Sequence, residues 1–517
     1  MSVRIFSAAL SGIDAKLIEV EVDSSSGIHS FNIVGLADKA VQESKERIGS
    51  AIKNSGFQPP KSKTRKVTVS LAPADLKKEG PAYDLPIALG YLCETEQIKF
   101  DTTKRLLAGE LSLDGRIKPT AGILAMALLA KKSGFKELIV PFYNVGEASI
   151  VSGINVIGAE TLSQVIGHLD RTSVISPTIH DKSRLPVDDN NLGDAFVAIK
   201  GQEYAKRALV VAAAGAHNVF MSGPPGSGKT LLAKALIDIL PSLSFDEAIE
   251  VTKIYSSIGM ISSYAPLSFS RPFRNPHHTT SAIAIVGGGT WPRPGEISLA
   301  HRGVLFLDEL PEFPRSVLES LRQPLEDGIV TVSRVAGSVR LPAKFMLVAA
   351  MNPCPCGNFG NPKADCICMP FTILKYKKKV SGPLLDRIDI QVNVPRETIG
   401  HEDELEIDRN RAKLAQIRTQ IQKAKETQLA RFEGLKIFSN SEMSYKNVEK
   451  LVMIEKSAKS MLKSAINAKG LSLRAYHKTL KVARTIADLE SAETLNESHI
   501  AEALAFRINE DVSNGMI

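Results

Sequence analysis

One short segment of the chain has the residue types that bind phosphate. Residues 223–230 read GPPGSGKT, in which glycines and small residues lead to a lysine and a threonine. Glycines let backbone amides point toward phosphate, the lysine reaches the outer phosphate groups, and the threonine ligates Mg²⁺ at the positive end of the helix that follows. We therefore expect ATP and Mg²⁺ to bind at Gly223, Pro224, Pro225, Gly226, Ser227, Gly228, Lys229, Thr230 and Leu231.

Two carboxylates close a second apolar segment. Residues 303–307 (GVLFL) read as a buried strand, and Asp308 and Glu309 follow it directly. Asp308 can hold the magnesium ion together with Thr230, directly or through water, while Glu309 can orient and deprotonate an attacking water. A phosphate loop followed by such a strand predicts ATP hydrolysis.

Strands and helices must hold these groups in position. A short apolar strand precedes the phosphate loop, and the amphipathic stretch LLAKALIDIL follows it. A third apolar strand, residues 344–351 (KFMLVAAM), ends at Asn352. These three strands in this order resemble the AAA+ ATPases. The resemblance implies that Asn352 lies between the other two strands and senses the γ-phosphate.

The same resemblance singles out two arginines. Arg387 ends a short helix in SGPLLDRID, the AAA+ position from which a neighbouring subunit completes the site. Such a finger contributes about 10³ to 10⁵ in rate, and its action between subunits implies a ring. Arg474 opens a C-terminal helix where the sensor 2 arginine of this class lies. Arg484 is the second candidate, and for either residue the alternative is a surface arginine on a lid helix.

Four of the five cysteines of the chain lie within residues 351–368, spaced C-x-C-x₉-C-x-C. Two close pairs can supply four thiolates in the tetrahedral arrangement of a structural Zn²⁺ site. Two reducible disulfides and free thiols in a loop are the alternatives. Because the loop lies between Asn352 and Arg387, zinc would rigidify the connection between those two residues. The candidate ligands are Cys354, Cys356, Cys366 and Cys368.

Composition sets the class of protein. The chain has 517 residues, of which 44% are hydrophobic and 23% charged, and this length predicts about two to four domains. No apolar run reaches the roughly 18 residues that a membrane helix requires, and the clustered cysteines are unlike a secreted disulfide framework. We expect a cytoplasmic protein without a membrane partner. The net charge of +8 is compatible with a polyanion as partner.

Several phrases carry a closer resemblance. IKGQ at 199–202, AAAGAHN at 212–218, FRNPHHTTS at 273–281 and MNPCPCG at 351–357 look like the magnesium-chelatase-like ATPases of bacteria, specifically the ComM/YifB family. The resemblance covers essentially the whole chain. It implies a cytoplasmic homo-hexameric DNA helicase that acts on single-stranded or branched DNA. The activity implied is branch migration while incoming DNA recombines during natural transformation, with recombination proteins as a further class of partner.

The N-terminal region resembles a different class, the proteolytic domain of Lon, in residues 79–89 and 108–124. Lon proteases use a Ser–Lys dyad. The matching positions here are Ala82 and, near the lysine position, Leu124. Without a hydroxyl nucleophile and an amine base, peptide cleavage loses its chemistry. We expect the fold to persist and to serve ring assembly or DNA binding; the basic string 61–66 favours DNA, with a solvated loop as its alternative.

The predicted fold class is α/β. A Lon-protease-like (ribosomal S5-type) α+β domain at 1–171 lacks the catalytic dyad and is followed by a polar linker at 172–193. An AAA+ P-loop core spans 194–396, and a helical lid spans 397–517, beginning with a long charged helix at 397–434.

Two segments are candidates for DNA contact. Residues 327–342 have two β-rich runs around a small-residue turn, which predicts a hairpin. In chelatase-like proteins such a hairpin enters the ring pore, so Arg334 or a neighbour near the turn would meet phosphate. Residues 287–295 match another pore loop, with Arg293 and Trp291 as candidates. Trp291 would stack on bases, or lie buried under the insertion.

Two other activities compete with a DNA motor. Magnesium chelation needs an integrin-like metal subunit, and the string nearest to a D-x-S-x-S loop, DSSSG at 23–27, breaks that pattern at its last position. A protein-remodelling AAA+ machine would share every ATPase motif. Such machines usually have an aromatic, hydrophobic pore loop, so the pore distinguishes the two.

Overall fold

The computed structural model describes residues 2–36, 38–62, 64–78, 80–178, 195–262, 265–289, 293–334, 337–360, 364–396, 404–435, 437–469 and 472–507. The chain divides into two compact units. The first is Met1–Val187 with Phe245–Phe269, and the second is Asp188–Ser244 with Ser270–Ile517. The chain thus passes from the first unit to the second, returns once and leaves again.

The first unit is built on a mixed seven-stranded sheet in the order β3-β4-β2-β1-β5-β8-β9. The β1–β2 and β2–β4 pairs are antiparallel and the other pairs are parallel. In β4, Val67, Val69 and Leu71 are buried because alternate side chains point to one face. The strands are β1 (Val3–Ser11), β2 (Asp14–Ser26), β3 (Ser30–Val34), β4 (Arg65–Ala72), β5 (Arg105–Leu107), β8 (Glu137–Pro141) and β9 (Asn155–Ala159), with a small β6 (Glu110–Leu111) and β7 (Ile117–Lys118) pair.

Helices cover this sheet, and one of them comes from a distant part of the sequence. Helix α9 (Phe245–Ser257) packs against α3, where the carbonyl of Ser256 accepts a hydrogen bond from the amide of Gly122 at 2.8 Å. The Ser256 hydroxyl donates to the buried Glu147 carboxylate at 2.7 Å. We had expected this segment within the 194–396 core. The other helices are α1 (Lys39–Asn54), α2 (Asp84–Glu94), α3 (Ile123–Lys132), α4 (Val145–Ser149) and α5 (Leu162–Leu169).

The second unit has a parallel five-stranded sheet in the order β11-β14-β17-β10-β18. Every residue of β14 and β17 is buried, as expected for central strands covered on both faces. The order puts β17 between β14 and β10, so the carboxyl ends of these three strands meet at one edge. The strands are β10 (Val219–Ser222), β11 (Phe273–Arg274), β14 (Val304–Leu307), β17 (Met346–Met351) and β18 (Ile390–Asn393).

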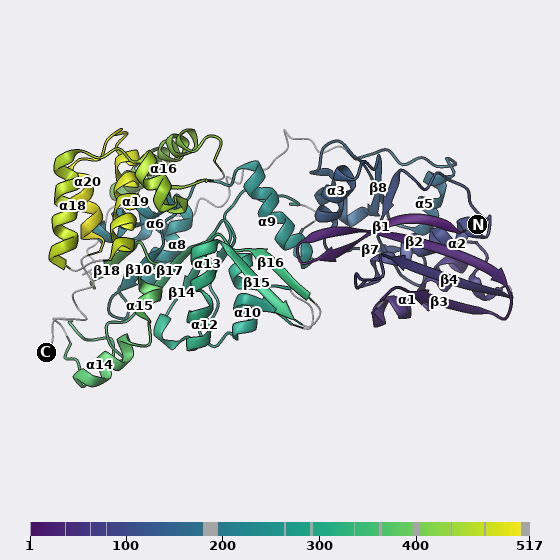
Figure 1. Cartoon of the computed structure of the whole chain (residues 1–517), viewed down its shortest axis with the longest axis horizontal. Helices are drawn as coiled ribbons and strands as arrows, with labels where there is room; N and C mark the ends of the chain where they lie inside the picture. Colours follow the sequence, from purple (N-terminus) through teal and green to yellow (C-terminus); the bar gives the residue numbers. More distant parts are fainter. Residues whose placement is uncertain are drawn as a thin grey trace. The chain divides into compact units, whose positions relative to one another are not determined.

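Helices α7 and α8 pack on the sheet, and the C-terminal helices pack on α7 (Figure 1). Helix α16 lies within the predicted charged helix 397–434 and is 28 residues long. In α19, Ser472 caps the first turn by accepting from the amide of Ala475 at 3.2 Å. The helices are α6 (Ala195–Ala198), α7 (Glu203–Gly215), α8 (Lys229–Ile239), α10 (Ala282–Val286), α11 (Glu296–Leu299), α12 (Arg315–Ser320), α13 (Arg322–Asp327), α14 (Pro370–Lys377), α15 (Gly382–Leu385), α16 (Glu404–Arg431), α17 (Tyr445–Leu451), α18 (Lys456–Lys469), α19 (Leu473–Leu489) and α20 (Glu497–Ala505).

Two hairpins complete the second unit. Strands β12 (Gly287–Gly288) and β13 (Arg293–Pro294) pair antiparallel, as do β15 (Ile329–Arg334) and β16 (Gly337–Pro342). The latter hairpin was predicted from its sequence.

Among the helices in the described ranges, none combines the length and the hydrophobicity that crossing a bilayer requires. The observed architecture is therefore α/β, with one mixed and one parallel sheet.

Candidate nucleotide site and four-cysteine site

The phosphate loop joins β10 to α8 and depends on glycine at three positions. Gly226 and Gly228 have φ angles of +73° and +87°, which side chains with a Cβ rarely adopt. At Gly223 a Cβ would lie 2.1 Å from the carbonyl oxygen of Val394. Ser227 Oγ is buried and has no hydrogen-bond partner in the described part of the chain. The loop therefore opens at the N-terminus of α8 with an unused donor, which suits a phosphate.

Lys229 fills the centre of this loop. Its ammonium donates to the carbonyls of Gly223 and Pro224 at 2.8 and 2.9 Å and to Asn352 Oδ1 at 3.2 Å. Burial lowers the pKa of this ammonium from its ordinary value, although the nearby carboxylates Asp308 and Glu309 oppose the change. Lys229 is the first residue of α8, so its contact to Asn352 connects the phosphate loop to the end of β17, the strand that lies between β10 and β14.

Thr230 and Asp308 meet beside the lysine. The Thr230 hydroxyl donates to Asp308 Oδ2 at 2.7 Å, and the other carboxylate oxygen accepts from the amide of Glu309 at 2.9 Å. A hydroxyl and a carboxylate oxygen are the ligands that Mg²⁺ takes in nucleotide sites. The donor set therefore fits the metal that ATP brings.

Glu309 has an unusual backbone and a partner that the sequence analysis did not assign. Its φ angle is +50°, in a region that costs a non-glycine residue free energy and is often found at functional sites. Glu309 Oε2 lies 3.4 Å from Nδ1 of His278, whose ring lies 4.1 Å from that of His277. Both histidines belong to the FRNPHHTTS phrase, whose first two residues form β11. Because β11 pairs with β14, the histidines follow a strand next to the one that Glu309 follows. This phrase was the signal in the sequence that could have identified them.

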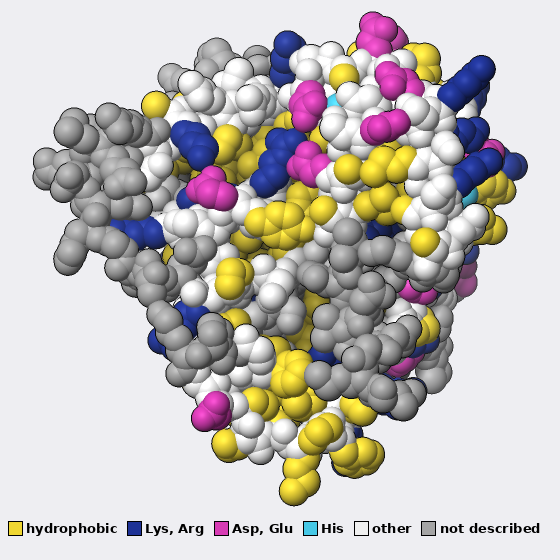
Figure 2. Space-filling view, turned by 90° about the vertical axis from the view of Figure 1, so that its left-hand side faces the viewer, with side chains coloured by type: hydrophobic (Ala, Val, Ile, Leu, Met, Phe, Trp, Pro, Cys, Tyr) yellow, Lys and Arg dark blue, Asp and Glu magenta, His cyan; other side chains and the backbone are white. Residues whose placement is uncertain are grey.

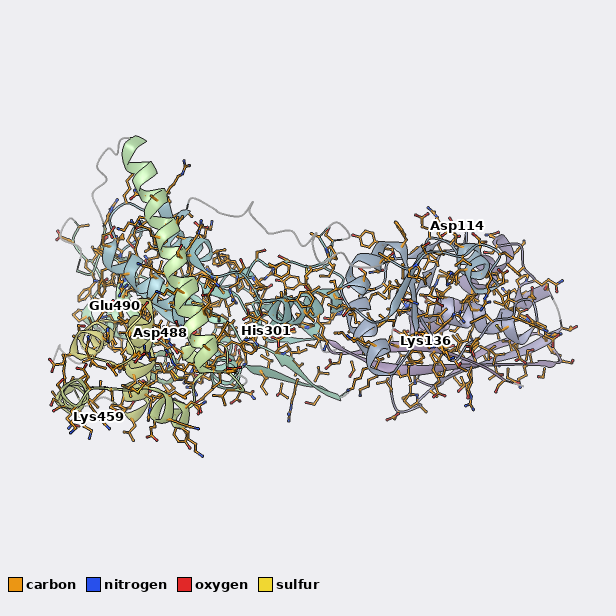
Figure 3. All side chains as sticks on the ribbon, turned by 90° about the horizontal axis from the view of Figure 1, so that it is seen from above. Asp114, Lys136, His301, Lys459, Asp488 and Glu490 are labelled. Carbon is orange, nitrogen blue, oxygen red and sulfur yellow. The ribbon has the colours of Figure 1, made fainter. Side chains whose placement is uncertain are left out.

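The candidate arginines lie away from this network. Arg387 and Arg474 both bond to Glu326 of α13, and the polar contacts found for them in the described chain do not include the phosphate loop or Asp308. Arg484, the second sensor candidate, is buried and ion-paired with Asp488 at 2.8 Å. Asp488 is labelled among the C-terminal helices in Figure 3. Arg484 therefore belongs to the packing of those helices, and Arg474 is the exposed candidate.

The four clustered cysteines converge. Their sulfur atoms all lie within 4.8 Å of one another, and three of the pairs are 3.4, 3.7 and 3.7 Å apart. Tetrahedral Zn–S bonds of about 2.3 Å give sulfur spacings of about 3.8 Å. The backbone amide of Asn358 lowers the pKa of Cys356 to about 6, whereas burial and the neighbouring thiols raise the pKa values of Cys366 and Cys368. These sulfurs therefore fit a zinc ion, and the ligands would be Cys354, Cys356, Cys366 and Cys368.

The cysteine loop packs directly on the phosphate loop. A Cβ on Gly357 would lie 2.4 Å from Cδ of Pro225. In the described part of residues 352–372, Cys354 and Gly357 are the buried residues. Three hydrophobic side chains are instead exposed at and before α14, namely Ile367, Met369 and Phe371. Figure 2 shows hydrophobic side chains gathered at the lower end of the face that it draws. The described part of the loop therefore has little apolar core of its own.

Comparison with known proteins covers nearly the whole chain. Family models described as magnesium chelatase, subunit ChlI, match residues 20–144, 195–402 and, for the C-terminal part, 412–507. Competence protein ComM of Haemophilus influenzae is 41% identical over 507 residues, which is 97% of each chain. The chain belongs to the ComM/YifB family of magnesium-chelatase-like AAA+ proteins. Membership in this family implies ATPase activity with ATP and Mg²⁺.

Two further relatives of this ComM/YifB chain are informative. YifB of Escherichia coli is 38% identical over 507 residues, covering 97% of this chain and 96% of its own. Lon protease 2 of Bacillus subtilis is 28% identical over 177 residues, which is 31% of this chain and 30% of the protease. The second similarity shows that part of the chain is homologous to Lon.

The first unit of this ComM/YifB chain has apolar side chains at the positions that the Lon resemblance assigns to the dyad. Ala82 and Leu124 are both buried. Nearby, the Asp84 carboxylate accepts from Arg47 Nε at 2.8 Å, and burial raises the pKa of Asp84 to about 6 although Arg47 opposes the rise. In the basic string 61–66, Lys61 pairs with Glu46 at 2.7 Å.

The predicted DNA contacts are only partly described. Arg334 ends β15 opposite Gly337, and the description does not extend to its side chain or to residues 335–336. Arg293 is exposed on β13. Trp291 lies outside the described residues, so neither base stacking nor burial is tested.

Proposed function

We propose that this chain is an ATP-driven DNA motor that works as a homo-hexamer in the cytoplasm. It binds single-stranded or branched DNA and promotes branch migration while incoming DNA recombines during natural transformation. The observation that supports ATP hydrolysis is that two hydrogen-bonded pairs, Lys229 with Asn352 and Thr230 with Asp308, lie at one sheet edge. The similarity to Competence protein ComM supports the biological setting.

Each residue of the network has a role in hydrolysis. The phosphate loop binds ATP, and Lys229 exchanges its two carbonyl partners for phosphate oxygens. Thr230 and Asp308 hold Mg²⁺, which neutralises phosphate charge when bound. Glu309 takes the proton of the attacking water, and Asn352 senses the γ-phosphate. His278, 3.4 Å from Glu309, orients that carboxylate.

The remaining groups act around this centre. Arg387 completes the site of a neighbouring subunit, and Arg474 is the sensor 2 arginine. We assign Arg474 to the same neighbouring site because in this chain both arginines bond to the Glu326 carboxylate. A structural Zn²⁺ held by the four cysteines fixes the loop that packs on Pro225. The first unit is a protease fold without the dyad, and it serves ring assembly or DNA binding.

The chief alternative is a protein-remodelling machine, and the hairpin of β15 and β16 favours DNA. This hairpin and residues 287–295 are the elements proposed to line the pore. Arg334 near the hairpin turn and Arg293 supply cations there, and Trp291 would stack on bases. Phosphate tracking by cations weakens steeply with salt.

ATPase assays with either polymer as activator separate the two functions. Single-stranded or branched DNA stimulates turnover, and Arg334→Ala weakens this stimulation more than it weakens basal hydrolysis. Arg315→Ala, an exposed arginine on α12, is the matched control. Stimulation by an unfolded protein with no response to DNA would replace the motor by a remodelling machine.

A further inference from the structure

Glu326 connects Arg387, the candidate arginine finger, to Arg474, the sensor 2 candidate. One of its carboxylate oxygens accepts from Nη2 of Arg387 and the other from Nη2 of Arg474. The arginines come from different segments, one directly after α15 and one from the first turn of α19. A single carboxylate therefore bridges two guanidinium groups that would otherwise repel each other.

The two arginine side chains differ in how many groups hold them. Arg387 also donates to the carbonyls of Arg322 and Pro383 at 3.1 and 2.7 Å, and its side chain is only 14% exposed. Arg474 is more exposed, at 44%, and Glu326 is its ion-pair partner. Arg387 is thus also held by a carbonyl of α13 and one of α15, whereas Arg474 depends on the carboxylate.

A buried ion pair joins the same two segments behind the surface. Lys478, one turn after Arg474 in α19, lies 2.7 Å from Asp389, two residues after Arg387. Burial opposes the charge on Asp389, yet Lys478 and His217 hold the pKa of this carboxyl below its usual range. The segments that carry the arginines are thus fixed to each other, and the geometry around Glu326 follows from the fold.

We propose that Glu326 is a positioning residue: it holds Arg387 and Arg474 as one unit that the subunit presents to ATP bound by its neighbour. The inference rests on the proposed ring ATPase and adds a residue to it. The triad of two guanidinium groups and one carboxylate has a net charge of +1, so it still attracts the phosphate oxygens of the neighbouring site. Glu326 itself does not touch the nucleotide.

Variants of Glu326 test the role in uniform rings. Misplacing a group at the reacting phosphate by about 1 Å costs up to about 100-fold in rate, so Glu326→Gln lowers kcat at least about tenfold. The KM for ATP changes less than about twofold, because the phosphate loop is intact. Glu326→Asp retains a carboxylate and recovers part of the loss. Asp327→Asn, on the adjacent exposed residue of α13, is the control and keeps full turnover.

Mixed rings locate the effect. A Lys229→Ala subunit can supply arginines but no working site, and an Arg387→Ala subunit supplies the reverse, so mixing them restores turnover at their shared interfaces. Adding Glu326→Gln to the Lys229→Ala subunit lowers the restored turnover by the factor seen in uniform rings. Adding it to the Arg387→Ala subunit leaves the restored turnover unchanged.

The outcomes separate the inference from the function on which it rests. No recovery in the parent mixture, with mixed rings verified by differently tagged subunits, would contradict the shared site itself. Recovery followed by equal losses in both arms, or by none, would overturn the positioning role of Glu326. A tenfold or greater loss confined to the arginine-supplying subunit supports it.

Discussion

The two units of the chain are both built on sheets with helices packed against them, but their polar groups are used differently. In the second unit, Lys229 donates to Asn352 and Thr230 donates to Asp308 at the carboxyl ends of parallel strands. In the first unit, Ala82 and Leu124 are buried and Asp84 is bonded to Arg47. A fold is stabilised by its apolar faces and does not by itself determine whether its polar groups form a reactive site.

The largest expected loss of activity comes from removing the reactive groups of the second unit. Glu309→Gln lowers kcat about 10³-fold, since loss of a general base costs about 10² to 10⁴, while nucleotide still binds. Lys229→Ala loses nucleotide binding, because the ammonium at the loop centre is gone. Turnover and binding of a fluorescent ATP analogue measure the two effects. Normal turnover by both variants would remove the AAA+ mechanism.

Metal removal tests whether the cysteine loop belongs with the reactive unit. Protein purified without chelators carries about one zinc ion per chain, and replacing Cys354 and Cys366 with Ser removes it. Because Gly357 of this loop packs on Pro225, we expect turnover to fall about tenfold. Replacing Cys93, which lies outside the cluster, with Ser leaves the zinc in place. Metal analysis that finds no zinc in the original protein would exclude the site.

The smallest effect on turnover is expected in the first unit. Asp84→Ala leaves Arg47 without its ion-pair partner, and breaking such a partly buried pair costs about 3 kcal/mol of folding free energy. Calorimetry should show the first unfolding transition at lower temperature, while basal turnover at 25 °C changes less than about twofold. Asp114→Ala is the control, since Asp114, labelled in Figure 3, pairs on the surface. A loss of turnover as large as that of Glu309→Gln would give the first unit a direct part in hydrolysis.

The sequence could predict the strands of the second unit because each has a distinct apolar run, and parallel strands bring their carboxyl ends to one edge. The expected position of Asn352 came from the resemblance to AAA+ ATPases, and in the structure Asn352 accepts a hydrogen bond from Lys229. The cysteine spacing likewise predicted a cluster, although only the structure reveals that Gly357 contacts Pro225.

Other features depend on partners that a sequence pattern does not name. The amphipathic helix α9 has one buried face, and nothing in its pattern says that the first unit buries it. Nothing in the sequence distinguishes Glu326 from the other acidic residues, and only the structure shows that two arginines distant in sequence bond to it. Arg484 resembled a sensor by its helical position, yet its neighbour Asp488 draws it into the core.

Branch migration on a labelled three- or four-stranded DNA junction tests the central claim most directly. The assay follows conversion of the junction to its products with ATP, without ATP, and with Glu309→Gln protein in place of the original. The account predicts ATP-dependent conversion that falls as salt rises and is absent with Glu309→Gln, while that variant still binds the junction. Junctions that stay intact in the presence of a fully active ATPase would contradict it.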